Sequence, residues 1–164
     1  MADLRLVAAP AEIKEAVPSL PIRVVLAENH RAMRDGVRLL LDAEEGIQVI
    51  GEAEHLEAAL RLTDGEQPHV LVLALAMISG SARETIGKLR ARAPAMQVVI
   101  LTMDESPVVA QHLLACGALG LVLKDRADDE LATAVHAAAR GEQYISSMIA
   151  ERLDMALRRS RPEE

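Results

Sequence analysis

Five short apolar runs alternate along the chain with five longer segments in which apolar residues recur every three or four positions. The short runs, typical of buried strands, span residues 22–27, 47–54, 69–75, 97–103 and 119–125. The longer segments have the period of amphipathic helices and span residues 28–46, 55–67, 81–94, 106–117 and 128–141. Strands that alternate with helices predict right-handed crossovers, and therefore a parallel sheet covered by helices on both faces.

Capping residues mark several of the predicted helix ends. Ser81 and Ser106 are suited to the N-cap position, Pro107 to the first helical position, and Gly117 to a helix end. The three strand runs that begin at residues 22, 69 and 97 are almost wholly apolar, which is typical of parallel strands buried on both faces.

Two segments lie outside the alternating pattern. Residues 1–21 contain scattered acids and prolines, and we expect a loosely structured extension there. Residues 148–161 place Ile149, Leu153, Ala156 and Leu157 on one helical face. This second segment is predicted to be either a linker helix or frayed tail, or a helix that leads to another domain or packs in a dimer.

Composition excludes several classes of partner. The net charge is −7 and aromatic residues make up only 1% of the chain, so we expect no direct nucleic-acid binding by this segment. No apolar run approaches the roughly 18 residues that span a bilayer, so no membrane association is predicted. A single cysteine, Cys116, cannot form an intramolecular disulfide and suits a reducing cytoplasm.

The polar residues at the strand ends are the candidates for chemistry, because ligands of doubly wound sheets bind outside the carboxyl ends of the strands. Glu28 and Asn29 follow the first strand, Thr102 ends the fourth, and Lys124 ends the fifth. The third strand instead reaches this edge with Ala74. The five histidines lack the short spacing of metal ligands, and no nucleophile–base set is discernible, so neither a metal site nor an enzyme is predicted.

An ordered set of motifs resembles a known family. The stretches VVLAENHRAMRDGVRLLL, PHVLVLALAMISG, VVILTMDES, ALGLVLKD and GEQYIS resemble the receiver domain of two-component response regulators, in the subgroup that carries a C-terminal LuxR-type helix-turn-helix. The resemblance covers residues 22–146. It implies a flavodoxin-like, five-stranded doubly wound (βα)5 sheet with strand order 2-1-3-4-5. Residues 147–164 would then form a linker or tail helix that leads to a possible DNA-binding output domain.

The resemblance also assigns roles to residues, and this sequence departs from several of them. Thr102 and Lys124 match the residues that contact the phosphoryl group in the family. Glu28 matches the first Mg²⁺-binding acid in charge, whereas Asn29 replaces the second acid. Ala74 stands where the family has its phosphoacceptor Asp.

The consequences of these departures are chemical. A methyl group offers no oxygen nucleophile, and a pocket with one acid is a poor site for Mg²⁺. We therefore expect a degenerate phosphorylation pocket with weak or absent Mg²⁺ binding and no other cofactor. Leu121 stands where the family often has a switching aromatic residue. Without an Asp at position 74, Lys124 needs another partner, and we expect it to pair with Glu28 while Thr102 adds a hydrogen bond.

Three classes of function remain open. The first is an atypical receiver, or pseudo-receiver, that regulates a transcriptional output by phosphorylation-independent contacts or homodimerisation. The second is a sensor in which the degenerate pocket holds a small anion or metabolite. The third is an enzyme or cofactor binder of the same layer order, which the lack of a phosphate-binding loop and of stacking aromatics disfavours.

Overall fold

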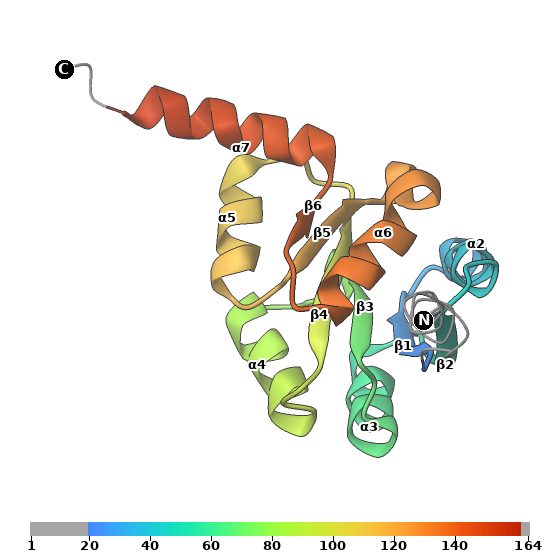
Figure 1. Cartoon of the computed structure of the whole chain (residues 1–164). Helices are drawn as coiled ribbons and strands as arrows, with labels where there is room; N and C mark the ends of the chain where they lie inside the picture. The colour runs from blue at the N-terminus through green and yellow to red at the C-terminus, as the bar shows by residue number, and fades with distance from the viewer. Residues whose placement is uncertain (1–19, 162–164) are drawn as a thin grey trace, which may run out of the picture.

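The computed structural model describes residues 20–161, which form a six-stranded sheet with helices on both sides (Figure 1). All strand pairs are parallel, and the strand order is β2-β1-β3-β4-β5-β6. The strands are β1 (Ile22–Ala27), β2 (Ile47–Ala53), β3 (Val70–Ala74), β4 (Gln97–Thr102), β5 (Gly120–Leu123) and β6 (Tyr144–Ile145). The predicted extension at residues 1–21 lies outside the described residues, except for its last two positions.

The sixth strand corrects the expected five-stranded sheet. β6 extends the sheet beyond β5, with Tyr144 opposite Gly120 and Ile145 opposite Leu121. A strand of two residues has no measurable alternation of polar and apolar positions, so hydrophobic periodicity could not detect it. The other five strands follow the expected order 2-1-3-4-5.

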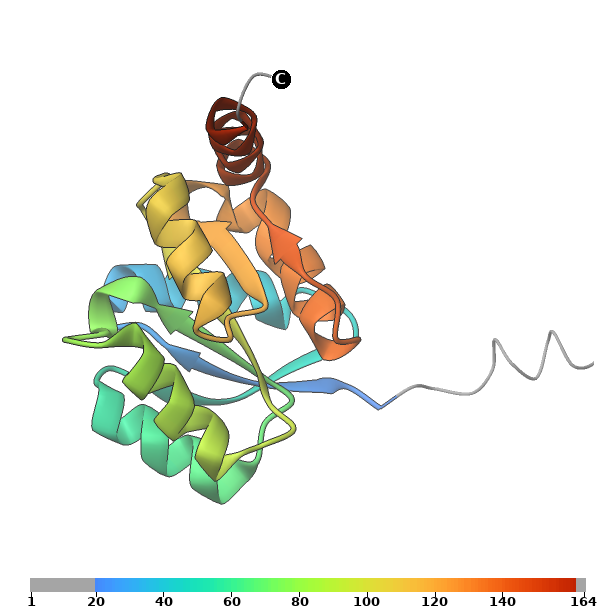
Figure 2. The ribbon, with the colours of Figure 1, turned by 90° about the vertical axis from the view of Figure 1, so that its left-hand side faces the viewer.

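Two helical layers cover the sheet. In the described part of the chain the helices are α2 (Arg31–Asp42), α3 (Leu56–Glu66), α4 (Ala82–Arg92), α5 (Pro107–Ala115), α6 (Ala127–Ala139) and α7 (Ser147–Ser160). α2 and α6 share one hydrophobic cluster with the sheet, and α3, α4 and α5 share the other (Figure 2). The side chains of Ser81 and Ser106 accept hydrogen bonds from backbone N–H groups at the starts of α4 and α5, which confirms both predicted N-caps.

The alternation of side chains along each strand builds the two clusters. Val24 and Leu26 of β1 pack on the side of α2 and α6, whereas Val25 and Ala27 pack on the side of α3, α4 and α5. Both layers are therefore filled by aliphatic side chains from the same short strands. Among residues 20–161, no helix is long and apolar enough to cross a membrane.

α7 is attached to one end of this sandwich rather than to the sheet face. It begins directly after β6 and packs against α5 through its two buried residues, Ile149 and Leu153 (Figure 1). The sequence left open whether this segment is a frayed tail, and the structure shows a helix of 14 residues.

A substitution at Gly120 of β5 would test how tightly the sheet is packed. A Cβ atom at this position would lie 2.9 Å from Cγ2 of the buried Val99 side chain, so Gly120→Ala should destabilise the protein by about 1–3 kcal/mol. Gly87→Ala is the matched control, because nothing lies within 4 Å of its Cβ and it is in the interior of α4. The control should stabilise by about 0.5–1 kcal/mol. Urea unfolding measures both, and equal effects would contradict the close packing at β5.

Candidate functional site

The candidate residues meet at the carboxyl edge of the sheet, where the ends of β1, β3, β4 and β5 are neighbours. Glu28 directly follows β1 and is fully buried, whereas the next residue, Asn29, is exposed. Ala74 and Thr102 are the last residues of β3 and β4, and both are buried. Lys124 begins the 3₁₀ turn after β5. Strand order thus brings together residues that are almost 100 positions apart in the chain.

An ion pair between Glu28 and Lys124 is the central contact of this site. The Lys124 ammonium lies 3.0 Å from Oε2 and 3.2 Å from Oε1 of Glu28. The Glu28 side chain has no exposed surface, and that of Lys124 is 17% exposed. This pair is the one expected from the sequence, and it joins the end of β1 to the end of β5.

The loop after β1 holds the Glu28 carboxylate in place. Glu28 Oε1 also accepts a hydrogen bond from the backbone N–H of His30, at 3.1 Å. The Arg34 side chain of α2 donates to the Glu28 carbonyl oxygen at 2.9 Å. Oε2 has the Lys124 ammonium beside it but no hydrogen bond of good geometry among the described residues. The carboxylate is therefore compensated mainly by charge.

Thr102 does not form the hydrogen bond that the sequence predicted. Its hydroxyl accepts a hydrogen bond from the backbone N–H of Asp104 at 2.9 Å, and no hydrogen bond joins it to Lys124. The Asp104 carboxylate in turn accepts from the backbone N–H of Ser106 at 2.8 Å. The expected Thr102–Lys124 bond is wrong, and the Thr102 hydroxyl is used by the backbone of the loop that follows β4. Thr102 and Asp104 instead shape that loop.

Leu121, at the position of the expected switch, is a core residue. It lies opposite Ile100 of β4 and Ile145 of β6 and is 1% exposed. Its side chain belongs to the cluster that also contains Leu113 of α5 and Ile149 of α7.

A shallow hollow adjoins the ion pair. It has a volume of about 670 Å³ and is lined by Glu28, Asn29, His30, Ala32, Met33, Ala76, Met103, Lys124 and Asp125. Met103 is 81% exposed although it is a large apolar residue. The hollow is thus an apolar surface with the Glu28–Lys124 pair at its edge.

Sequence reasoning missed a second polar cluster next to the site. The Glu130 carboxylate of α6 accepts hydrogen bonds from the Ser146 hydroxyl and from the Ser147 hydroxyl and backbone N–H. The Ser146 hydroxyl also accepts from the backbone N–H of Leu123, at 2.9 Å. Since Leu123 immediately precedes Lys124, this cluster ties the end of β5 to the first turn of α7. The sequence signal was an acid next to the inward-facing Leu131 of α6.

The same cluster affects Tyr144 of β6. Burial, and secondarily the negative charge of Glu130, raise the pKa of the Tyr144 phenol above its ordinary value. The phenol therefore stays neutral to higher pH than in an unfolded chain.

The Glu28 carboxylate at the carboxyl edge has few neighbours that could share a metal ion with it. No group of three His, Cys, Asp or Glu side chains that could hold a metal occurs between residues 20 and 161. Glu28 already has the Lys124 ammonium 3.0 Å away, and a divalent cation at its carboxylate would meet that like charge.

The parallel sheet in this strand order, with an acid after β1, a threonine at the end of β4 and a lysine after β5, is the arrangement that the resemblance to receiver domains implied. The family model of the response regulator receiver domain matches residues 24–156. The chain therefore belongs to the response regulator receiver domain family.

Relatives place the chain more closely. It is 30% identical over 141 residues to the nitrate/nitrite response regulator protein NarL of Escherichia coli K12, covering 86% of this chain and 65% of that protein. It thus spans just under two thirds of the length of that relative. A LuxR-family two-component response regulator from Aurantimonas sp. has a solved structure with a TM-score of 0.77 and 27% identity, covering 84% of this chain and 98% of that chain.

A third relative has been solved as an isolated receiver domain. The isolated receiver domain of RcsB from Salmonella enterica serovar Typhimurium, solved in the presence of the phosphomimetic BeF3⁻, superimposes with a TM-score of 0.73 at 26% identity. The match covers 81% of this chain and 99% of that one. The fold that surrounds the Glu28–Lys124 pair is thus shared with a receiver domain that was solved in the presence of a phosphomimetic.

The Glu28–Lys124 pair should dominate the stability of the site. Lys124→Met leaves a buried carboxylate without its charge partner and should cost about 3 kcal/mol. Glu28→Gln combined with Lys124→Met should cost less than the sum of the single variants, by on the order of 1 kcal/mol or more. Denaturant unfolding of the four proteins gives this coupling energy.

An exposed pair provides the control for this cycle. Arg31 and Asp35 form an ion pair on α2 with side chains 86% and 63% exposed, so Arg31→Met should change stability by about 0.5 kcal/mol or less. Strictly additive costs at Glu28 and Lys124 would show that the buried pair is not energetically coupled.

Proposed function

We propose that this chain is an atypical receiver domain that regulates a transcriptional output without phosphorylation, through protein contacts that include homodimerisation. One observation carries the proposal: the residue at the end of β3 is the buried Ala74, at the same edge of the sheet as a Glu28–Lys124 pair whose two charges compensate each other. A methyl group cannot accept a phosphoryl group. Lys124, the lysine that would stabilise a phosphoryl oxygen, is already paired with the Glu28 carboxylate.

The proposal extends to the metal that the family's chemistry uses. Mg²⁺ prefers several hard oxygen ligands in octahedral geometry. Glu28 is the only carboxylate that remains of the family's three positions, and Asn29 is an exposed amide. We therefore propose that Mg²⁺ binds weakly or not at all at this edge.

The transcriptional part of the proposal comes from the relatives. NarL and the LuxR-family regulator of Aurantimonas are response regulators, and RcsB, which is 26% identical to this chain, has been solved bound to DNA. The net charge of −7 argues that any DNA contact would belong to an output domain and not to this segment. A cytoplasmic location is proposed with it.

The phosphorylation test uses acetyl phosphate with Mg²⁺, and beryllofluoride with Mg²⁺. The chain should show no added phosphoryl mass and no metal-dependent stabilisation by beryllofluoride, because position 74 offers no oxygen. The Asn29→Asp, Ala74→Asp double variant restores two carboxylates and should gain a signal in either assay. A phosphoryl group mapped to residues 70–80 of the unmodified chain would contradict the proposal.

A second candidate function is small-molecule sensing, favoured by the 670 Å³ hollow between Met33, Ala76 and Met103. Glu28 and Asp125 offset the charge of Lys124 there, so a mostly apolar ligand with a small polar head fits better than a polyanion. A metabolite screen by thermal shift tests this candidate. A ligand whose stabilisation is lost in Met33→Glu, but kept in the exposed control Glu57→Arg on α3, would favour sensing over simple protein contact.

A further inference from the structure

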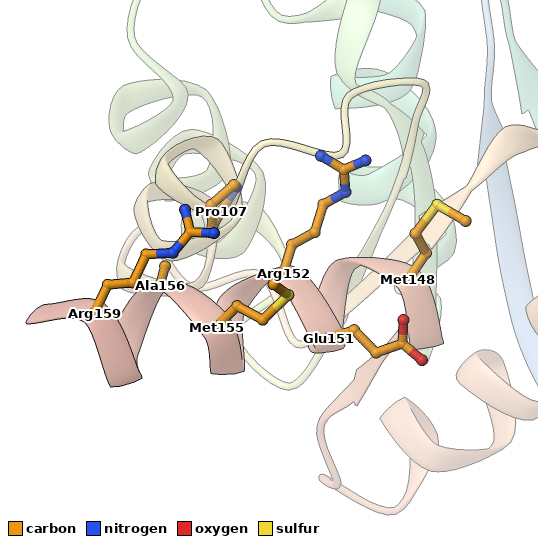
Figure 3. Close-up of a pocket in the computed structure, with 7 residues that line it drawn as sticks. All are labelled: Pro107, Met148, Glu151, Arg152, Met155, Ala156 and Arg159. Atoms are coloured by element: carbon orange, nitrogen blue, oxygen red, sulfur yellow. The ribbon is translucent and has the colours of Figure 1, made fainter.

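α7 has a second face that nothing in the domain covers. While Ile149 and Leu153 pack against α5, another side of the helix lines a groove of about 560 Å³. The lining residues are Pro107, Met148, Glu151, Arg152, Met155, Ala156 and Arg159 (Figure 3). Met148 and Met155 are 39% and 53% exposed. An apolar strip with charged neighbours on an ordered helix is typical of a protein contact surface.

Two sets of polar contacts attach α7 to the rest of the domain. The Arg152 guanidinium lies 3.0 Å from the Glu105 carboxylate in the loop before α5, toward which its side chain extends (Figure 3). At the first turn of α7, Ser146 and Ser147 donate hydrogen bonds to Glu130. A surface fixed at both places loses little conformational freedom when it binds a partner.

The charged residues on α7 are spaced so that they could pair with the same residues of a second copy of the helix. Glu151 and Arg159 lie four residues before and four residues after Met155. When two such helices run antiparallel with a twofold axis beside Met155, Glu151 of one copy lies level with Arg159 of the other, and the contact occurs twice. Within residues 20–161 neither side chain forms an ion pair, whereas Arg152 and Arg158 are paired with Glu105 and Asp154.

We propose that this face of α7 is where two copies of the chain associate, with their α7 helices antiparallel about Met155. The inference rests on the dimer part of the proposed function and assigns its surface. Acidic side chains interleave with the arginines of α7, which disfavours a nucleic-acid phosphate backbone as the occupant. A second copy carries both signs of charge at the required spacing.

Charge reversal tests this pairing by sedimentation equilibrium of the whole chain. The unmodified protein should dimerise, and Glu151→Arg and Arg159→Glu should each weaken the dimer by about tenfold, because each turns two attractive contacts into repulsive ones. The double variant restores both contacts with the charges exchanged, so its dissociation constant should return to within about threefold of the original. Glu57→Arg, on the exposed side of α3, is the matched control and should change nothing.

A cross-link provides an independent readout. In a Cys116→Ser background, Met155→Cys should form a disulfide-linked dimer under mild oxidation, since the twofold axis brings the two positions together. Glu57→Cys in the same background should remain monomeric on a denaturing gel.

The outcomes separate this proposal from the proposed function. A dimer that none of the α7 variants weakens would overturn the α7 surface but leave phosphorylation-independent dimerisation standing. A chain that remains monomeric at high concentration would overturn both. Single variants that weaken the dimer without recovery in the double variant would overturn the antiparallel register about Met155.

Discussion

A carboxylate with no exposed surface must be compensated by an opposite charge, and at the carboxyl edge of this sheet Lys124 compensates Glu28. The need to compensate this buried charge constrains more of the structure than the two side chains themselves. Glu28 belongs to the loop after β1 and Lys124 to the turn after β5, so their contact holds together elements separated by β3 and β4 in the sheet. Arg34 and the backbone of His30 then orient the loop around the buried carboxylate. The geometry of the site follows from satisfying one buried charge.

The second polar cluster extends this order along the carboxyl edge of the sheet to α7. Glu130, Ser146 and Leu123 form a hydrogen-bonded connection that starts one residue before Lys124 and ends at the first turn of α7. Here the connection consists of buried hydrogen bonds around an aliphatic core, which favours one arrangement of α7 over several.

Much of this arrangement could be predicted from the sequence, for identifiable reasons. Five strands with β-branched, apolar character and five amphipathic helices imply the parallel topology, and that topology alone brings Glu28 and Lys124 to the same edge. β6 escaped prediction because two residues, Tyr144 and Ile145, carry no period. The partner of Thr102 was wrong because it depends on the path of a loop, which residue types do not specify.

The Glu130–Ser146 contact was missed for a different reason. It joins residues 16 positions apart on a helix and a strand end, and no local pattern encodes such a pairing. Single acids in an otherwise apolar stripe are ambiguous until the opposing element is known. Of all the features of a site, long-range polar contacts of this kind are the hardest to predict from the sequence.

An internally neutralised site changes where regulation can act. In a receiver that is phosphorylated, an added negative charge next to a lysine creates an imbalance that the surrounding loops must accommodate. In this chain the Lys124 ammonium already has the Glu28 carboxylate 3.0 Å away, and Ala74 adds no charge at the end of β3. Under the proposed phosphorylation-independent function, regulation would act at other surfaces, of which the described residues offer the apolar hollow beside Met103 and the exposed face of α7. The α7 face is fixed to the buried polar cluster, so binding there requires little rearrangement of the domain.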